Sequence, residues 1–191
     1  MSSLEQIKQL LSQQRPSKWE QLPDLELYMD QVLTYMQRQY VASRKEDQLT
    51  SSMINNYIKE GLLARANGKK YSKEHLAHLT AISMMKQVLS VKDTGFLVKQ
   101  SAGDLPPEDF YTLFLSILDG QMLAALGVIP QDDDERLLTE AALRLAVESY
   151  VSRLACERLL DLLRPGNEKE KEKEKDKEKS RQKEKKASKD E

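Results

Sequence analysis

The residues best suited to molecular recognition are small and polar, and they lie on one side of a short helix predicted over residues 50–60. At 3.6 residues per turn, this outer side carries Ser51, Ser52, Asn55, Asn56 and Lys59. Hydroxyl and amide groups can hydrogen-bond to the edges of bases, and a lysine can contact a phosphate. The outer side therefore has the chemistry of a nucleic-acid contact, although an ordinary amphipathic helix would show the same spacing.

Both ends of this helix are marked in the sequence. Thr50 is a good N-cap, because its hydroxyl can accept a hydrogen bond from an unpaired backbone N–H of the first turn. Gly61 is a good residue to follow the helix, because it takes a positive φ at no steric cost. The inner side is predicted to be buried and carries Met53, Ile54, Tyr57 and Ile58.

A short basic loop and a second helix follow. Arg65, Lys69 and Lys70 give the loop its positive charge, and the Asn-Gly pair at 67–68 indicates a turn. Tyr71 then leads to Ser72, which is predicted to cap the next helix. That helix has apolar residues at steps of three and four, namely Leu76, Leu79, Ile82, Met85, Val88 and Leu89. A further short helix is predicted after Ser90.

This order of elements resembles the winged helix-turn-helix of MerR-type bacterial regulators. The matching residues are Thr50, Tyr57, Gly61, Leu62, Leu63, Tyr71, Ser72, Glu74, Leu76, Leu79, Ser90, Val91 and Asp93. The segments Leu22-Pro23-Asp24 and 28–33 are also similar to an uncharacterised bacterial family, catalogued only as a domain of unknown function with a MerR-like core. The resemblance covers residues 22–98 and implies a DNA-binding regulator of transcription.

The resemblance implies that helix 50–60 reads the major groove of double-stranded DNA and that the basic turn 65–70 contacts phosphates. The candidate DNA-binding residues are Thr50, Ser51, Ser52, Asn55, Asn56, Lys59, Arg65, Lys69, Lys70 and Tyr71. Ser52 and Asn55 stand where MerR-type recognition helices usually carry arginine, and Asn56 stands where they usually carry an aromatic residue. A second interpretation is therefore a non-enzymatic adaptor, a protein-interaction module that keeps the winged-helix fold and has lost DNA binding.

Charge is segregated along the 191 residues, although the formal net charge is only −1. Residues 44–99 carry ten Lys/Arg and five Asp/Glu, whereas residues 101–164 carry five Arg and twelve Asp/Glu. A basic middle beside an acidic C-terminal half is typical of a nucleic-acid face attached to a module that does not bind nucleic acid. The alternative is that the lysines serve solubility alone.

Several classes of protein are not favoured by the sequence. We find no phosphate-binding glycine loop, no nucleophile elbow and no Cys/His cluster, so we expect neither an enzyme nor a cofactor. His75 and His78 are three residues apart, which is not the spacing of a zincin helix, so we expect no metal site. The lack of a long apolar run or secretory signal, together with the single cysteine, favours a cytoplasmic protein without a membrane span.

The sequence predicts an all-α fold in four parts. Residues 1–21 form a helical arm that Trp19 and Leu22 dock onto the core, and 22–100 form the winged helix-turn-helix, whose supporting helix begins at Pro23-Asp24. Residues 101–164 form a helical hairpin, with one helix from about Pro107 to Ala125 and then a long helix apolar on two sides. A homodimer through 104–163 and a single-chain bundle both account for this pattern. Residues 165–191 form a disordered Lys/Glu-rich tail.

Overall fold

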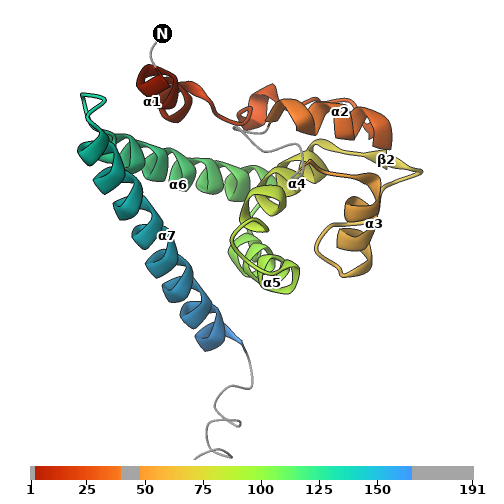
Figure 1. The fold of residues 1–191 in the computed structure, drawn as a ribbon. Helices are drawn as coiled ribbons and strands as arrows, with labels where there is room; N and C mark the ends of the chain where they lie inside the picture. The colour runs from red at the N-terminus through yellow and green to blue at the C-terminus, as the bar shows by residue number, and fades with distance from the viewer. Residues whose placement is uncertain (1–2, 40–47, 165–191) are drawn as a thin grey trace, which may run out of the picture. The chain divides into compact units, whose positions relative to one another are not determined.

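A computed structural model of the protein describes residues 3–39 and 48–164. These residues are mainly helical, with seven α-helices, a short 3-10 helix and one two-stranded antiparallel sheet (Figure 1). In chain order the elements are α1 (Ser3–Gln13), η1 (Trp19–Gln21), β1 (Leu27–Tyr28), α2 (Met29–Gln39), α3 (Ser51–Lys59), β2 (Lys70–Tyr71), α4 (Lys73–Met85), α5 (Val91–Ala102), α6 (Pro107–Val128) and α7 (Glu135–Leu163). The predicted disordered tail lies outside the described residues.

The sheet corrects the predicted start of the supporting helix. β1 pairs antiparallel with β2, with Leu27 opposite Tyr71, so α2 begins only at Met29 instead of at Pro23-Asp24. Leu25 continues the apolar pattern of α2 toward the N-terminus, but it is 80% exposed. The partner strand lies more than forty residues further along the chain, so local periodicity gives no signal for this pairing.

The core is built around α4. This helix is buried along most of its length, because α2, α5 and α6 pack against it. Its fully buried side chains include Leu76, Leu79 and Ile82, as the apolar spacing predicted. They meet Val32 and Met36 of α2, together with Ile54, Tyr57, Leu63, Tyr71, Val98 and Phe110 from the surrounding elements. This core holds α3 against α2, and β2 against α2 and α4.

The N-terminal arm docks as predicted. Leu22 is buried with Ala77 and Tyr111, and Trp19 packs against that cluster. The Tyr111 hydroxyl donates a hydrogen bond of 2.8 Å to the backbone oxygen of Ser17. α1 packs against α6 (Figure 1), and the guanidinium of Arg15, just after α1, pairs with the carboxylate of Asp119 in α6.

The sixth helix begins at Pro107 as predicted and continues to Val128, so Gly127 lies in the helix rather than in the following turn. α6 is long and apolar enough to cross a membrane by length and composition alone, a test that core helices of soluble proteins also pass. Only 6% of its most apolar window is buried, and it carries Asp119 near its centre. Because so little of this window is buried, most of the apolar residues of α6 keep some exposed surface in the described part of the chain.

The seventh helix is capped by Asp134, whose carboxylate accepts a hydrogen bond of 3.0 Å from the backbone N–H of Leu137. A boundary between two compact units falls after Tyr150, within this helix. In the first unit, Leu143 is 64%, Val147 is 52% and Tyr150 is 68% exposed. The sequence predicted a long helix apolar on two sides, and in the single chain these three side chains of that helix are not covered.

Candidate functional site

The outer face of α3 is the surface that the sequence singled out. The Thr50 hydroxyl accepts a hydrogen bond of 3.2 Å from the backbone N–H of Met53, which confirms the predicted N-cap. Gly61 follows the helix with φ of +73° and confirms the predicted end. These two ends set the helix so that Ile54 and Tyr57 are buried. The side chains left exposed are those of Thr50, Ser51, Ser52, Asn55, Asn56 and Lys59.

The basic loop forms a tight turn next to β2. The backbone N–H of Asn67 donates to the oxygen of Lys70 at 3.0 Å, and the N–H of Lys70 donates to the oxygen of Asn67 at 2.9 Å. Gly68 and Lys69 occupy the two central positions with φ of +54° and +71°, as a type I′ turn requires. The Asn-Gly pair at 67–68 therefore predicted a turn correctly, but the two central residues of the turn are Gly68 and Lys69, one position later in the chain. This turn leaves the side chain of Lys69 exposed.

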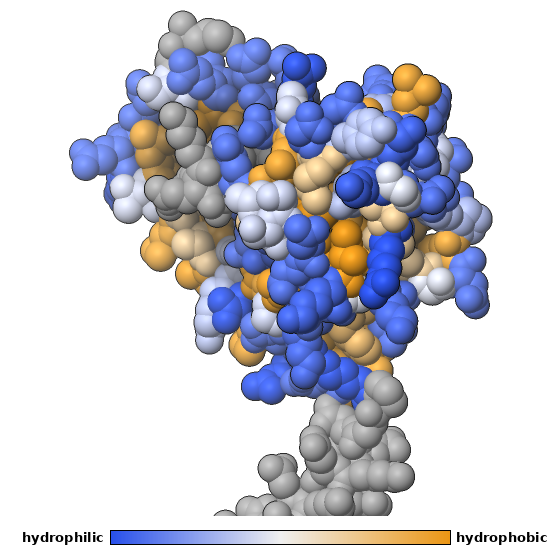
Figure 2. Space-filling model, turned by 90° about the vertical axis from the view of Figure 1, so that its right-hand side faces the viewer, coloured by the Kyte–Doolittle hydropathy of each residue, from blue (hydrophilic) through white to orange (hydrophobic). Residues whose placement is uncertain are grey.

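Positive charge on this side of the protein comes from residues of different exposure. Arg65 and Lys69 are exposed, whereas Lys70 is half-buried with its Nζ 5.5 Å from the centre of the Tyr28 ring. β2 and α3 both lie at the right of Figure 1, and Figure 2 looks at the protein from that side. The face in Figure 2 is mainly hydrophilic, with smaller hydrophobic patches between the polar side chains.

Tyr71 does not share this surface. It is only 4% exposed, and its ring meets the ring of His75 edge-on with centroids 5.5 Å apart. Burial raises the pKa of the Tyr71 hydroxyl. The Nδ1 of His75 accepts a hydrogen bond of 3.0 Å from the backbone N–H of Ser72, at the predicted start of α4. Tyr71 therefore belongs to the core beneath the turn, and its side chain is not placed to contact DNA.

His78, the second histidine considered as a metal ligand, also has a packing role. The ring of His78 stacks on Phe110 with centroids 5.3 Å apart, and its Nδ1 lies 2.9 Å from the backbone oxygen of Glu74. Among the described residues, no group of three His, Cys, Asp or Glu side chains is arranged to hold a metal ion.

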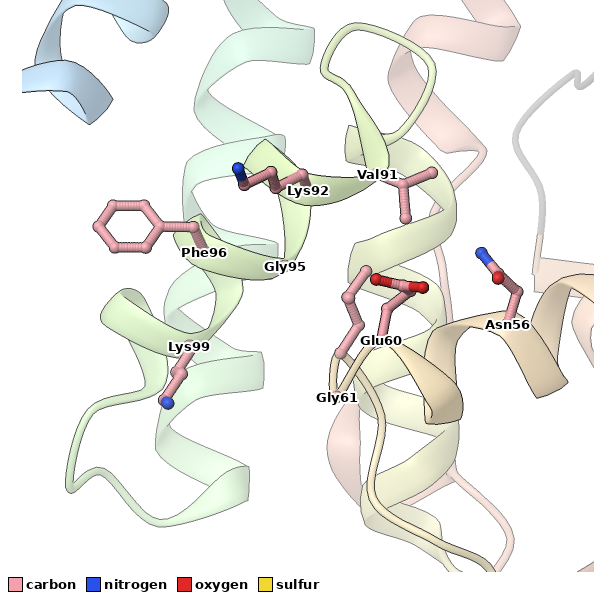
Figure 3. Close-up of a pocket in the computed structure, with 9 residues that line it drawn as sticks. Asn56, Glu60, Gly61, Val91, Lys92, Gly95, Phe96 and Lys99 are labelled. Carbon is pink, nitrogen blue, oxygen red and sulfur yellow. The ribbon is translucent and has the colours of Figure 1, made fainter. Parts of the chain in front are cut away.

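A groove of about 600 Å³ lies between the end of α3 and α5, next to the exposed outer face of α3. Asn56 and Glu60 line it from the α3 side, and Val91, Lys92, Gly95, Phe96 and Lys99 line it from α5 (Figure 3). Gly61 and Leu62 complete the lining. Apart from Asn56, none of these residues was a candidate from the sequence. Lys92, Phe96 and Lys99 recur at helical spacing, but that pattern gives no indication that α3 lies across from them.

The end of α3 and α5 approach each other closely at Gly95. A Cβ atom on Gly95 would lie 2.5 Å from Cγ and 2.8 Å from Cδ1 of Leu62. These distances are well inside the ~3.5–4.0 Å of an ordinary carbon–carbon contact. The absence of a side chain at Gly95 therefore allows Leu62 to lie against α5 beneath the groove.

Comparison with known proteins identifies the family of this chain. Residues 17–114, slightly more than half of the 191-residue chain, match the family described as Domain of unknown function (DUF1836). This match contains η1, both strands, α2 to α5 and the start of α6. No curated protein and no solved structure matches the chain. The chain therefore belongs to the DUF1836 family.

Proposed function

We propose that the protein binds double-stranded DNA as a regulator of transcription, with α3 as the recognition helix. The observation that carries this proposal is the division of α3 into a buried apolar side and an exposed side made of hydroxyls, amides and Lys59. An exposed helix side without an acid is compatible with a polyanion. Glu60 is the helix C-cap and stands at one end of that side.

The proposed contacts follow from the chemistry of each group. An α-helix with its side chains is about 10–12 Å wide, and the major groove of B-DNA is about 12 Å wide. Within the groove, the amide of Asn55 is suited to the N6 and N7 groups of adenine. Lys59, Arg65 and Lys69 are suited to phosphates, and Lys70 adds charge close to the sheet. The proposal is also supported by the order of α3, the basic turn, α4 and α5, which is the order of elements that resembles MerR-type regulators.

We also propose that a second copy of the chain covers the apolar surface of α7. Leu143, Val147 and Tyr150 are spaced at i, i+4 and i+7, so they form one stripe, and all three are more than half exposed. A stripe of this spacing suits pairing with another helix of the same kind. The pair would present two recognition helices to one duplex, and its target would then be a near-palindrome.

A salt titration of binding to labelled genomic duplex fragments tests the DNA proposal. Lys69→Ala should weaken binding to all fragments and lower the slope of log affinity against log salt by about 1. Asn55→Ala should cost roughly 1–3 kcal/mol on a selected site and little on random DNA. Arg136→Ala, which removes an exposed positive charge from α7, is the matched control and should leave affinity unchanged.

The decisive negative result is a folded protein without affinity for the fragments at low salt. The DNA proposal would then be abandoned, and the exposed face of α3 would be tested as a protein-binding face. The second copy is tested by light scattering at micromolar concentration. Wild type should be a dimer and Val147→Glu a folded monomer, because a charge in the stripe opposes apolar pairing. A monomeric wild-type chain would refute the pairing proposal.

A further inference from the structure

We infer that the groove between α3 and α5 binds a small organic anion, with the ligand's apolar body in the groove and its anionic group at the lysine rim. The groove volume of about 600 Å³ lies within the ~300–1,000 Å³ range of small-molecule sites in proteins. Its walls are α5, the end of α3 and the short turn of residues 60–62 that follows α3, so the cavity does not depend on a long loop.

The apolar part of the lining selects the body of the ligand. Leu62 lies beneath the groove against Gly95, and Val91 faces the groove at the start of α5 (Figure 3). Val91 keeps 36% of its surface exposed. A branched or aromatic hydrocarbon group would remove this apolar surface from water, which favours binding in proportion to the area covered.

The charged part of the lining selects the other end of the ligand. Lys92 and Lys99 are seven residues apart on α5 and therefore lie on one side of that helix. Both are exposed, and their long side chains can reach a carboxylate or phosphate at the edge of the groove while it remains partly hydrated. Opposite them, the carboxylate of Glu60 and the amide of Asn56 can accept hydrogen bonds from ligand hydroxyl or amine groups.

Glu60 and the apolar lining favour a small anion over a strand of DNA inside the groove. Successive phosphates of a strand would bring negative charge toward the Glu60 carboxylate, whereas a compact ligand can keep its single anionic group on the lysine side. A sugar–phosphate strand also has little apolar surface to place against Val91 and Leu62. A ligand with one charged end and one apolar end satisfies both parts of the lining.

The groove has a consequence for recognition that rests on the proposed function. Asn56 belongs both to the exposed face of α3 and to the groove lining. A ligand that engages its amide would change the affinity of α3 for DNA, and DNA would change the affinity for the ligand by the same factor. Binding of the ligand itself requires no DNA, so the two proposals can be tested separately.

The experiment is a titration of the full chain, without DNA, with sodium benzoate, followed by amide chemical shifts in a nitrogen-15 correlation spectrum. Benzyl alcohol is the matched neutral probe with a similar ring. Benzoate should give saturable shifts at the amides of Gly61 and Gly95, and benzyl alcohol should bind more weakly. The double variant Lys92→Gln/Lys99→Gln should weaken benzoate binding by about fourfold or more, since each surface charge contributes roughly two- to fivefold. Arg136→Gln, the control, should not change it.

The outcomes separate clearly. Saturable benzoate shifts that require the two lysines support the inference, whether or not the chain binds DNA. Shifts of equal size with benzyl alcohol, shifts unaffected by the double variant, or no shifts at Gly61 and Gly95 up to tens of millimolar would each overturn it. A DNA titration with wild-type affinity in the double variant would show in addition that the lysines are not needed for the DNA contact.

Discussion

Replacing Gly95 with alanine gives the most direct test of how α3 and α5 are joined. Gly95 is inside a helix, where alanine is favoured over glycine by about 1 kcal/mol in the absence of other contacts. However, the new Cβ would lie 2.5 Å from Cγ of Leu62, an atom close to the Leu62 backbone that cannot move away as a chain end can. Forcing an additional methyl group into a packed contact costs about 1–3 kcal/mol.

The contact should outweigh the helix preference. We expect Gly95→Ala to lower the free energy of unfolding by up to about 2 kcal/mol, which is the cost of the contact less the helix preference, since Leu62 must leave its place beneath the groove. Gly120→Ala is the matched control, because Gly120 is also inside a helix and a Cβ there would meet nothing within 4 Å. The control should raise stability by about 0.5–1 kcal/mol. Thermal unfolding followed by circular dichroism should therefore separate the two variants by roughly 1–12 °C.

A double substitution identifies the cause. In a Leu62→Ala background the obstructing atoms are absent, so adding Gly95→Ala should no longer destabilise the protein. The coupling between the two sites should be at least about 1 kcal/mol. If Gly95→Ala stabilises the wild type as Gly120→Ala does, the close approach of Leu62 to α5 is wrong, and the groove beneath which Leu62 lies loses its structural basis.

Three other variants test the surrounding structure. Ile54→Ala should lower the free energy of unfolding in urea by about 2–5 kcal/mol, because Ile54 is fully buried behind the polar face of α3. Lys69→Asn should raise the thermal midpoint, since asparagine tolerates φ of +71° better than lysine, while weakening DNA binding. Burial raises the pKa of Tyr111 from 10.0 to about 12, so its contribution to stability is complete below pH 10 and lost as pH rises toward 12. Urea unfolding across that pH range should show a smaller loss in Tyr111→Phe; an equal loss would contradict this assignment.

The boundaries of α3 were predictable because their signals are local. The hydroxyl of Thr50 and the missing side chain of Gly61 act within one turn of the helix, so their effect can be inferred without the rest of the fold. Once those ends are set, the period of the helix decides that Ile54 is inside and Asn55 outside. The exposed face therefore followed from residues 50–61 alone.

The start of α2 was not predictable in the same way. Leu25, Leu27 and Tyr28 continue the apolar pattern of α2 backward, so periodicity assigned them to the helix. The structure instead pairs Leu27 with Tyr71, because the end of the basic turn brings an extended segment beside it. Tyr71 was misassigned for the same reason, since the sequence shows an aromatic residue beside lysines but not the helix that covers it. Both errors come from contacts between distant parts of the chain.

The groove shows why some candidate functional residues could not be predicted from the sequence. Its lining joins the end of α3 to α5 across the 28 residues between Leu62 and Val91, and only the missing Cβ of Gly95 allows that approach. In the sequence, Gly95 lies inside a predicted helix, where it is simply an unfavourable residue. Its favourable role is visible only when Leu62 is placed next to it.

The small number of positive charges on the exposed face of α3 links the proposal of DNA binding to the proposal that a second copy of the chain covers α7. On α3 the only positive charge is Lys59, and the nearby turn adds Arg65 and Lys69 as exposed charges. Because affinity for DNA rises with the number of phosphates neutralised, one copy with so few charges should bind weakly and with a shallow salt dependence. Two copies joined through the stripe containing Val147 would double these contacts, and the second face would bind at high effective concentration.

Val147→Glu should therefore reduce both the affinity and the salt slope of DNA binding, although it lies outside the recognition face. A monomeric Val147→Glu protein with wild-type affinity and slope would show that a single copy is the DNA-binding unit.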